Sequence, residues 1–135
     1  MMSEIADRLE VAELFGRLAR VLDEGTPDDL RQIYTKDVVV RSPRGNELHG
    51  IDTVLEFVRS TAVDGERTQH LHSDVLVTVD GDQADASANQ LAFFYREGEA
   101  PHRLAGLRLT YTAVRTEEGW RFREANIGRA WQRGD

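Results

Sequence analysis

The sequence predicts an α+β fold in which N-terminal helices cover the concave face of a curved, cone-shaped antiparallel sheet. Three observations predict it. The first half of the chain carries apolar residues at helical spacing, the second half carries four long stretches rich in Val, Thr, Tyr, Phe and Trp, and turn-forming residues separate these stretches. Helices followed by a run of strands are typical of α+β layers. Because a long sheet twists and coils, helices laid across its concave face are expected to leave a pocket.

The helical half begins with one long amphipathic helix, predicted from Ser3 to about Leu22. Its apolar residues recur every three or four positions: Ile5, Leu9, Ala12, Phe15, Leu18, Ala19 and Leu22. Gly25 is expected to end this helix. The following Thr26-Pro27-Asp28-Asp29 offers a cap, a proline for the first helical position and two acidic residues, which predicts a short second helix. Residues 51–62 return to helical spacing and predict a third.

The strand half begins after Gly65, although a short strand is already predicted at 38–41, before the turn-forming residues 42–46. Asp80-Gly81 and Glu118-Gly119 are expected to form tight hairpin turns, because such pairs accept positive φ angles. The long strands are predicted at about 68–79, 83–96, 103–116 and 120–131.

Composition limits the function classes. With 135 residues, the chain has the length of one domain, so residues 1–135 are expected to form a single one. It has no cysteine, which excludes disulfides, thiolate nucleophiles and Cys-ligated metals. The net charge of −7 repels phosphate backbones and anionic lipids, so neither nucleic acid nor membrane is expected as a partner. No apolar run could span a bilayer and no signal peptide is recognisable, which predicts a soluble cytoplasmic protein.

The opening of the first long strand, RTQHLHSD at 67–74, is the most informative segment. His70 and His72 would share one face of an ideal strand, and Asp74 is the one local residue that could complete a metal site. A metal needs further ligands, so no metal is predicted. His49 and His102 lie in turn-like contexts and are expected to be exposed.

Asp23 is the second candidate, because a carboxylate at the C-terminal end of a helix faces the negative end of the dipole. Such a position needs a compensating partner or has a use; a simple polar helix end is the alternative.

In the second long strand, alternation places a row of alanines on one face and mixed aromatic and polar residues on the other. The alanine row (Ala84, Ala86, Ala88 and Ala92) is suited to a closely packed helix or subunit. We interpret the opposite face, with Asn89, Leu91, Phe93 and Tyr95, as a cavity wall. Tyr95 and Asn89 would donate hydrogen bonds to a ligand oxygen, or else be polar groups satisfied within the core.

The remaining pocket candidates come from three elements. Phe15 of the first helix and Leu109 of the third long strand are expected to contact the substrate, and Asn126 and Arg129 to reach the pocket mouth. Trp120, Phe122 and Trp131 are expected in the core or in a dimer contact. Motifs for a nucleophile elbow, a phosphate-binding loop and dinucleotide binding are absent, which leaves acid–base chemistry on a small molecule.

The order of these parts resembles the SnoaL-like group of the nuclear transport factor 2 superfamily. The resemblance rests on a long helix ending in Asp23, the RTQH strand opening, VDGDQAD, and a closing GW-x-F with a second Trp. Members include polyketide cyclases, scytalone dehydratase, ketosteroid isomerase and limonene epoxide hydrolase. Scytalone dehydratase is similar in local pattern: its aspartate falls on Asp23 and its RTQH histidine on His70. Its two tyrosines and a second histidine fall on Leu22, Ser42 and Tyr95.

These features lead to a functional hypothesis: a cofactor-independent lyase, isomerase or cyclase acting on a small hydrophobic, oxygenated molecule. Asp23 would orient His70 or act as the base itself, His70 would shuttle the proton, and Tyr95 and Asn89 would bind an enolate oxygen. A non-catalytic binding or scaffold protein of the same fold is the alternative, and an accessory subunit of an oxygenase is a third. A homodimer is expected by analogy with the family.

Overall fold

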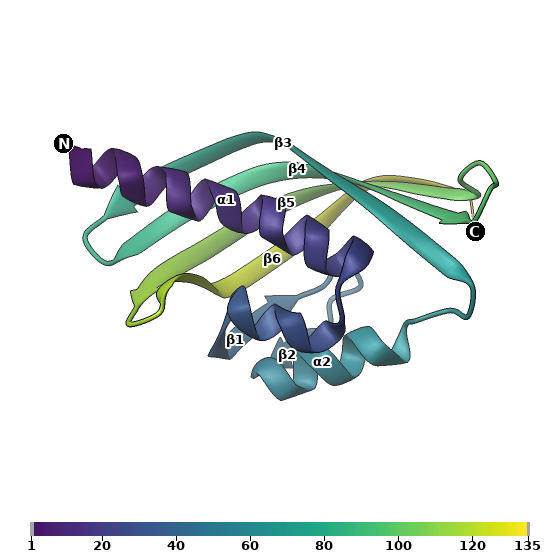
Figure 1. Cartoon of the computed structure of the whole chain (residues 1–135), viewed down its shortest axis with the longest axis horizontal. Coiled ribbons are helices and arrows are strands. Elements are labelled where there is room, and N and C mark those ends of the chain that lie inside the picture. The colour runs from purple at the N-terminus through teal and green to yellow at the C-terminus, as the bar shows by residue number, and fades with distance from the viewer. Residues whose placement is uncertain (1, 135) are drawn as a thin grey trace.

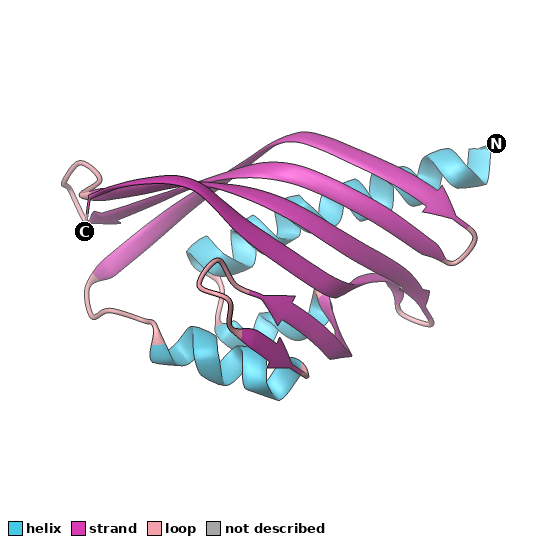
Figure 2. Ribbon diagram, turned by 180° about the vertical axis from the view of Figure 1, so that it is seen from behind, coloured by secondary structure: helices cyan, strands magenta, loops and turns pink. Residues whose placement is uncertain are grey.

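A computed structural model describes the backbone of residues 2–134 and the side chains of residues 4–134. It consists of one curved, open six-stranded sheet with its helices on one face (Figures 1 and 2). The helices are α1 (Met2–Glu24), the 3₁₀ helix η1 (Pro27–Gln32) and α2 (Ile51–Ser60). The strands are β1 (Tyr34–Arg41), β2 (Glu47–His49), β3 (Glu66–Asp80), β4 (Gln83–Arg96), β5 (Arg103–Thr116) and β6 (Gly119–Gly134).

The strands are ordered β2-β1-β6-β5-β4-β3 across the sheet. Neighbours are antiparallel except β1 and β6, which are parallel. Figure 1 shows α1 crossing the concave face of the four long strands, with α2 and η1 beside the short strands. The α+β fold class predicted from the sequence is thereby confirmed. Among residues 2–134, no helix combines the length and apolar character needed to cross a membrane.

The long strands match their predicted ranges closely, and the short elements differ. The second helix is a 3₁₀ turn that ends at Gln32, because Ile33 and Tyr34 turn into the core and Tyr34 begins β1. The predicted strand at 38–41 is the second half of β1. The short strand β2 was not predicted: its three residues pair with the end of β1 across the turn at 42–46, and such a length carries no readable alternation.

The buried stripe of α1 differs from the predicted one. Val11, Leu14, Phe15 and Leu18 are at most 2% exposed, whereas Ile5 and Leu9 are 47% and 60% exposed. The stripe continues toward the N-terminus through Asp7, not through an apolar residue. The Asp7 carboxylate accepts two hydrogen bonds of 2.8 Å from Arg115 and lies 3.1 Å from the Trp120 indole nitrogen. Because the helix was predicted from apolar residues at helical spacing, an ion-paired carboxylate on its packed face could not be recognised in this way.

A bulge in β3 divides the strand into two parts with opposite alternation. Its pairing with β4 shifts between Ser73 and Leu76, and Asp74 has a positive φ of 54°. Before the bulge the even-numbered residues face the helices, and after it the odd-numbered Val75, Val77 and Val79 pack against the core. One strand thus supplies polar side chains at one end of the concave face and apolar side chains at the other.

Candidate functional site

Asp23 lies in the last turn of α1 and directs its carboxylate onto the beginning of β3. Its Oδ1 lies 2.7 Å from His70 Nδ1, and its Oδ2 accepts a hydrogen bond of 2.8 Å from the His70 backbone N–H. The Thr68 hydroxyl donates to Oδ1 at 3.0 Å. These three bonds compensate the carboxylate for its position at the negative end of the helix dipole. Thr68 and His70 reach it together because side chains two apart in a strand share a face.

The contact fixes the state of the His70 ring. The carboxylate accepts from Nδ1, so Nδ1 carries a proton, and in the neutral form of the ring it is Nε2 that presents its lone pair. No group among the described residues hydrogen-bonds Nε2. The His70 and Asp23 side chains are only 10% and 16% exposed, so the pair is shielded from bulk water on most sides. An oriented imidazole with one free nitrogen can accept or return a proton.

The pair opens into a cleft of about 680 Å³ between the end of α1, the end of α2 and the concave face of the sheet. Leu22, Val58 and Phe94 supply apolar lining, and Glu66 and Arg103 supply charged lining. The volume suits a small organic molecule. The pocket expected beneath the helices therefore exists, and both Asp23 and His70 lie in it.

His72 shares the inward face with His70 but has a different environment. Its Nε2 lies 2.8 Å from Gln90 Oε1, its ring packs at 5.6 Å from that of Phe15, and its Nδ1 is buried without a hydrogen-bond partner in the described part of the chain. Burial lowers its pKa from the usual 6.5, so the ring is held neutral.

The two imidazoles thus have separate partners. Asp74 is exposed at the bulge, 2.9 Å from the Asn89 amide. No cluster of three metal-ligating side chains occurs in the described residues. His49 and His102 are exposed as predicted and pair with Glu47 and Glu66.

The predicted cavity wall on β4 lies on the wrong face. Tyr95, Phe93 and Leu91 pair with Arg67, Gln69 and Leu71 of β3, the residues that alternate with the inward Thr68 and His70. Asn89 is likewise exposed on this convex face. The prediction that these four side chains share a pocket with Asp23 and His70 is therefore wrong. The alanine row faces the helix, which is one of the two alternatives expected for it: Ala84, Ala86 and Ala88 are buried in the core beneath α1.

Four further candidates also lie outside the cleft. Phe15 and Leu109 are each 1% exposed and belong to the closed core. Asn126 pairs with Thr110 on the convex face, where its Oδ1 accepts from Arg41 at 3.0 Å. Arg129 is exposed and bonds Gln132 at 2.9 Å. Trp120 and Phe122 are buried as expected.

The cleft contains further residues that the sequence did not point to, among them Thr68, Phe94 and Arg103. Thr68 stands two before His70, so the alternation already used for His72 could have found it. Phe94 and Arg103 follow from the correct facing of β4, since Thr68, Phe94 and Arg103 are register partners across three strands.

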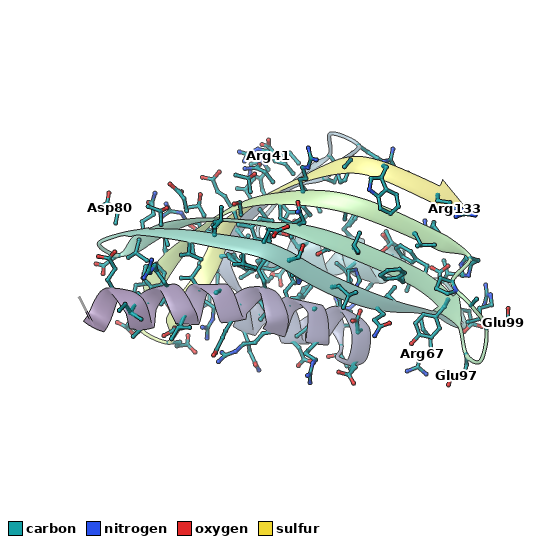
Figure 3. The ribbon with its side chains drawn as sticks, turned by 90° about the horizontal axis from the view of Figure 1, so that it is seen from above. Arg41, Arg67, Asp80, Glu97, Glu99 and Arg133 are labelled. Atoms are coloured by element: carbon teal, nitrogen blue, oxygen red, sulfur yellow. The ribbon has the colours of Figure 1, made fainter. Side chains whose placement is uncertain are left out.

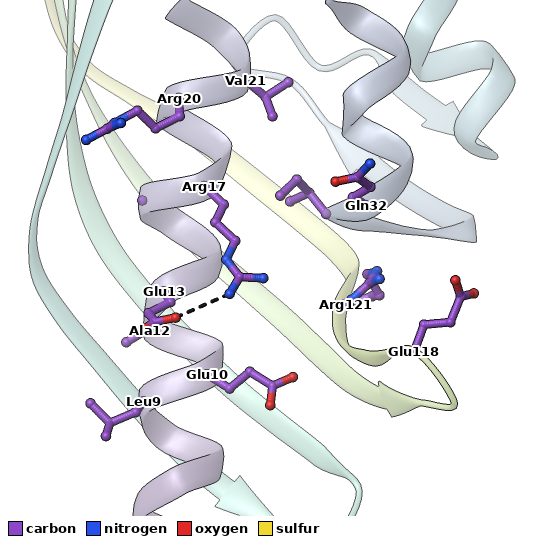
Figure 4. Close-up of a pocket in the computed structure, with 12 residues that line it drawn as sticks. Leu9, Glu10, Ala12, Glu13, Arg17, Arg20, Val21, Gln32, Glu118 and Arg121 are labelled. Atoms are coloured by element: carbon purple, nitrogen blue, oxygen red, sulfur yellow. Dashed lines mark hydrogen bonds and ion pairs between the residues drawn. The ribbon is translucent and has the colours of Figure 1, made fainter. Parts of the chain in front are cut away.

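A larger groove of about 970 Å³ runs along the outer side of α1, between that helix, η1 and the β5–β6 hairpin (Figure 4). Several of its charged groups are engaged in contacts within the fold. Arg17 bonds Glu13 at 3.4 Å, and Glu10 accepts the Trp120 backbone N–H at 2.7 Å. The smaller cleft is the better candidate for chemistry because it contains the aspartate–histidine pair.

The comparison with known proteins agrees with this fold. A family model described as the SnoaL-like domain matches residues 3–126. The chain belongs to the SnoaL-like domain family. The resemblance found in the sequence is thus confirmed for almost the whole chain. None of the curated protein sequences matches it.

Several solved structures share the fold of this SnoaL-like chain, and one of them is named as a protein of the nuclear transport factor 2-like superfamily. A scytalone dehydratase-like protein from Novosphingobium aromaticivorans DSM 12444 has a TM-score of 0.87 and 16% identity, covering 100% of this chain and 92% of that one. The hexachlorocyclohexane dehydrochlorinase LinA-type3 from Novosphingobium barchaimii LL02 has a TM-score of 0.83 and 15% identity, with 98% and 92% covered. A nuclear transport factor 2-like superfamily protein from Salmonella enterica serovar Typhimurium LT2 has a TM-score of 0.81 and 16% identity. The match covers 93% of this chain and 92% of that one. The TM-scores show a common fold.

Proposed function

We propose that this protein is a cofactor-independent lyase or isomerase that moves a proton on a small hydrophobic, oxygenated substrate. The observation that carries the proposal is the 2.7 Å contact between Asp23 Oδ1 and His70 Nδ1 at the edge of the cleft. Two solved structures of this fold are named as a dehydratase and a dehydrochlorinase, and both names denote eliminations. The family supports cofactor-free catalysis on small molecules in general.

In this proposal His70 Nε2 accepts a proton from a substrate carbon. The C–H electron pair then forms a double bond, and either a leaving group departs from the neighbouring carbon or the charge moves onto a carbonyl oxygen. His70 returns its proton to the leaving group, to another carbon or to water. Asp23 stabilises the imidazolium that forms transiently. Because both oxygens of Asp23 are already hydrogen-bonded, the geometry favours an orienting role over that of the base.

The direct test is turnover of three probe classes: β-hydroxy ketones for dehydration, β,γ-unsaturated ketones for isomerisation, and a polychlorinated cyclohexane for dehydrochlorination. With the substrate that reacts, His70→Ala is expected to lower kcat by about 10²- to 10⁴-fold. Asp23→Asn should lower it by a comparable factor, because an amide no longer enforces the Nδ1–H tautomer. His49→Ala, which removes an exposed imidazole elsewhere, should retain the wild-type rate. A folded His70→Ala variant with an unchanged kcat would refute the proposal.

The tautomer can be checked without a substrate. ¹⁵N NMR of the His70 ring should show a protonated Nδ1 and an unprotonated Nε2 in the wild type. In Asp23→Asn the Nε2–H form should appear. A His70 ring that carries its proton on Nε2 in the wild type would contradict the arrangement on which the mechanism depends.

A non-catalytic binding protein is the second candidate, and one observation favours it. Asp23 also joins the end of α1 to β3 through three hydrogen bonds, which is a structural role sufficient in itself. Binding of the probe ketones in the cleft without any product would support this candidate over the enzyme.

We also propose that two copies of the chain associate through the convex face of the sheet. Leu71, Leu91, Gly106 and Trp131 are successive register partners across β3, β4, β5 and β6, and the three large side chains are 51%, 39% and 47% exposed. Trp131 lies directly over Gly106, where any Cβ would collide with its indole. This row carries no charge, so a second copy can pair with it face to face although each chain has a net charge of −7.

Sedimentation equilibrium tests the association. A dimer is expected for the wild type and a monomer for Leu91→Arg, which places a charge in the centre of the row. The exposed Leu9 of α1 lies on the other side of the sheet, so Leu9→Arg is the matched control and should remain dimeric. A monomeric wild type at about 100 μM would refute the association, since obligate interfaces are far tighter.

A further inference from the structure

A charged residue outside the aspartate–histidine pair lies in the same cleft: Arg103, at the beginning of β5. Its guanidinium carbon lies 3.7 Å from the centre of the Phe94 ring, and its Nη2 lies 3.5 Å from Glu66 Oε1. Its Nε is buried and has no hydrogen-bond partner among the described residues. The side chain is 27% exposed, which leaves part of the guanidinium open to the cleft.

Glu66 does not satisfy this guanidinium. The Glu66 carboxylate already accepts a bond of 2.7 Å from His102 Nε2, and its contact with Arg103 is long. A guanidinium has five N–H donors, and a carboxylate that binds it well takes two of them in parallel at about 2.7–2.9 Å. Arg103 therefore retains donors for a further acceptor, including one that is already removed from water.

The other arginines that line the cleft are committed elsewhere. Arg59 bonds Asp28 at 2.9 Å, and Arg67 bonds Glu97 at 3.0 Å. Figure 3 shows Arg67 with Glu97 at the end of the sheet remote from Asp80, around the β4–β5 turn. Arg103 is thus the cleft arginine with the largest unused donor capacity.

The register fixes the spacing between Arg103 and the reacting pair. Arg103 pairs with Phe94 and Phe94 with Thr68, so Arg103 stands two strands away from Thr68, and His70 follows Thr68 by two residues on β3. At about 4.8 Å between strands and about 3.3 Å per residue, the backbone of Arg103 lies about 10 Å from that of Thr68 and about 12 Å from that of His70. A molecule of one or two rings spans that interval and buries its apolar body against Phe94 and Val58.

We propose that Arg103 binds a carboxylate of the substrate, so that the substrates of this site are hydrophobic carboxylic acids whose reacting carbon lies at His70. This inference rests on the proposed function, because it places the acid in the cleft of the Asp23–His70 pair. Arg103 acts by binding and positioning. The pairing of Arg103 with Glu66 in the free protein would then be exchanged for a bidentate pairing with the ligand.

Benzoate is the probe, with the isosteric but neutral benzamide as its comparison, and binding is followed by NMR chemical shifts. Benzoate is expected to bind with a Kd on the order of millimolar, as suits so small a ligand, and to shift the Arg103 Nε–Hε signal. Benzamide should bind at least about tenfold more weakly, because it lacks the charge that a buried guanidinium selects. Equal affinities for the two compounds would overturn the proposal.

Three variants locate the site. Arg103→Gln should abolish the preference for benzoate, whereas Arg129→Gln, which removes an exposed arginine outside the cleft, should change its Kd by less than about twofold. Glu66→Gln removes the competing carboxylate and should tighten benzoate binding by about threefold or more. If Arg103→Gln fails to fold, Glu66→Gln carries the test, and an unchanged or weaker affinity in that variant refutes the proposal.

Benzoate binding needs no turnover, so the two proposals can fail separately. If benzoate binds but no substrate is turned over, the carboxylate site is supported and the proposed enzymatic function is refuted. If neutral ketones are turned over and carboxylates are not preferred, the enzymatic function is supported and the proposed role of Arg103 is refuted.

Discussion

Phe15 was expected from the sequence to contact the substrate, but the structure buries it between α1 and the sheet. Truncating its side chain therefore tests whether the ring is part of the closed core or borders a pocket. The ring is 1% exposed and packs at 4.9 Å from Phe122, 5.5 Å from Tyr111 and 5.6 Å from His72, centre to centre. The neighbouring rings are anchored on sheet strands and cannot move far to fill a void. Phe15→Ala should therefore approach the upper part of the usual range, a loss of about 4 kcal/mol in the free energy of unfolding.

Urea denaturation followed by tryptophan fluorescence measures this loss, since Trp120 is buried in the same core. With an m-value of about 2 kcal/mol/M, the midpoint should fall by about 2 M at unchanged slope. Leu9→Ala is the control on the same helix: Leu9 is 60% exposed, so its truncation should change stability by less than about 0.5 kcal/mol. A loss below about 1 kcal/mol for Phe15→Ala would refute the reasoning, because it would mean that the ring borders open space.

Three pH-dependent effects follow from buried or paired groups. The hydrogen bonds from Arg115 hold the pKa of Asp7 below its usual 3.8, so its stabilising contribution is complete above that pH and is lost as the pH falls through the lowered value. Asp7→Asn should accordingly flatten the Tm profile between about pH 5 and 2. Burial lowers the pKa of His72 from 6.5, so stability should fall as the pH drops below 6.5, until the folded-state ring also protonates; in His72→Phe the Tm should no longer decline there. Burial raises the pKa of Tyr34 to about 12, so phenolate absorbance should show Tyr34 un-ionised at about pH 11, and stability should decline above about pH 10, where an unfolded tyrosine ionises.

The sequence was sufficient for the fold and, among the residues of the cleft, for Asp23 and His70. Four strands of 14 to 16 residues carry strong alternation and are separated by turn-forming residues, so their ranges were readable. Asp23 was found because a carboxylate is unfavourable at the C-terminal end of a helix, and His70 because it falls on the RTQH histidine of the family that the sequence resembles. Their contact could not be predicted, because it depends on where the end of α1 crosses β3, which is a tertiary property.

The bulge at Asp74 shows how facing can change within one strand. The sequence SDVLVTV contains no glycine to mark the break, and the positive φ falls on an aspartate whose side chain lies 2.9 Å from the Asn89 amide. A strand with regular alternation through this point would turn either His70 and His72 or Val75 and Val77 away from the helices. The extra residue allows the polar site and the apolar core to occupy the same face of β3.

The wrong prediction that the aromatic face of β4 lines the cavity has a physical cause that applies to other strands as well. Alternation gives two faces but does not say which one is covered, and aromatic residues were assigned to the cavity because ligand pockets are often aromatic. Here α1 lies close against the strand, and only side chains as small as Ala84, Ala86 and Ala88 fit beneath it. The larger residues are thereby left to the convex face, where Leu91 lies in the exposed row that ends at Trp131. A row of alanines therefore indicates the face toward a closely packed helix, and the same criterion places Phe94, not Tyr95, beside the Asp23–His70 pair.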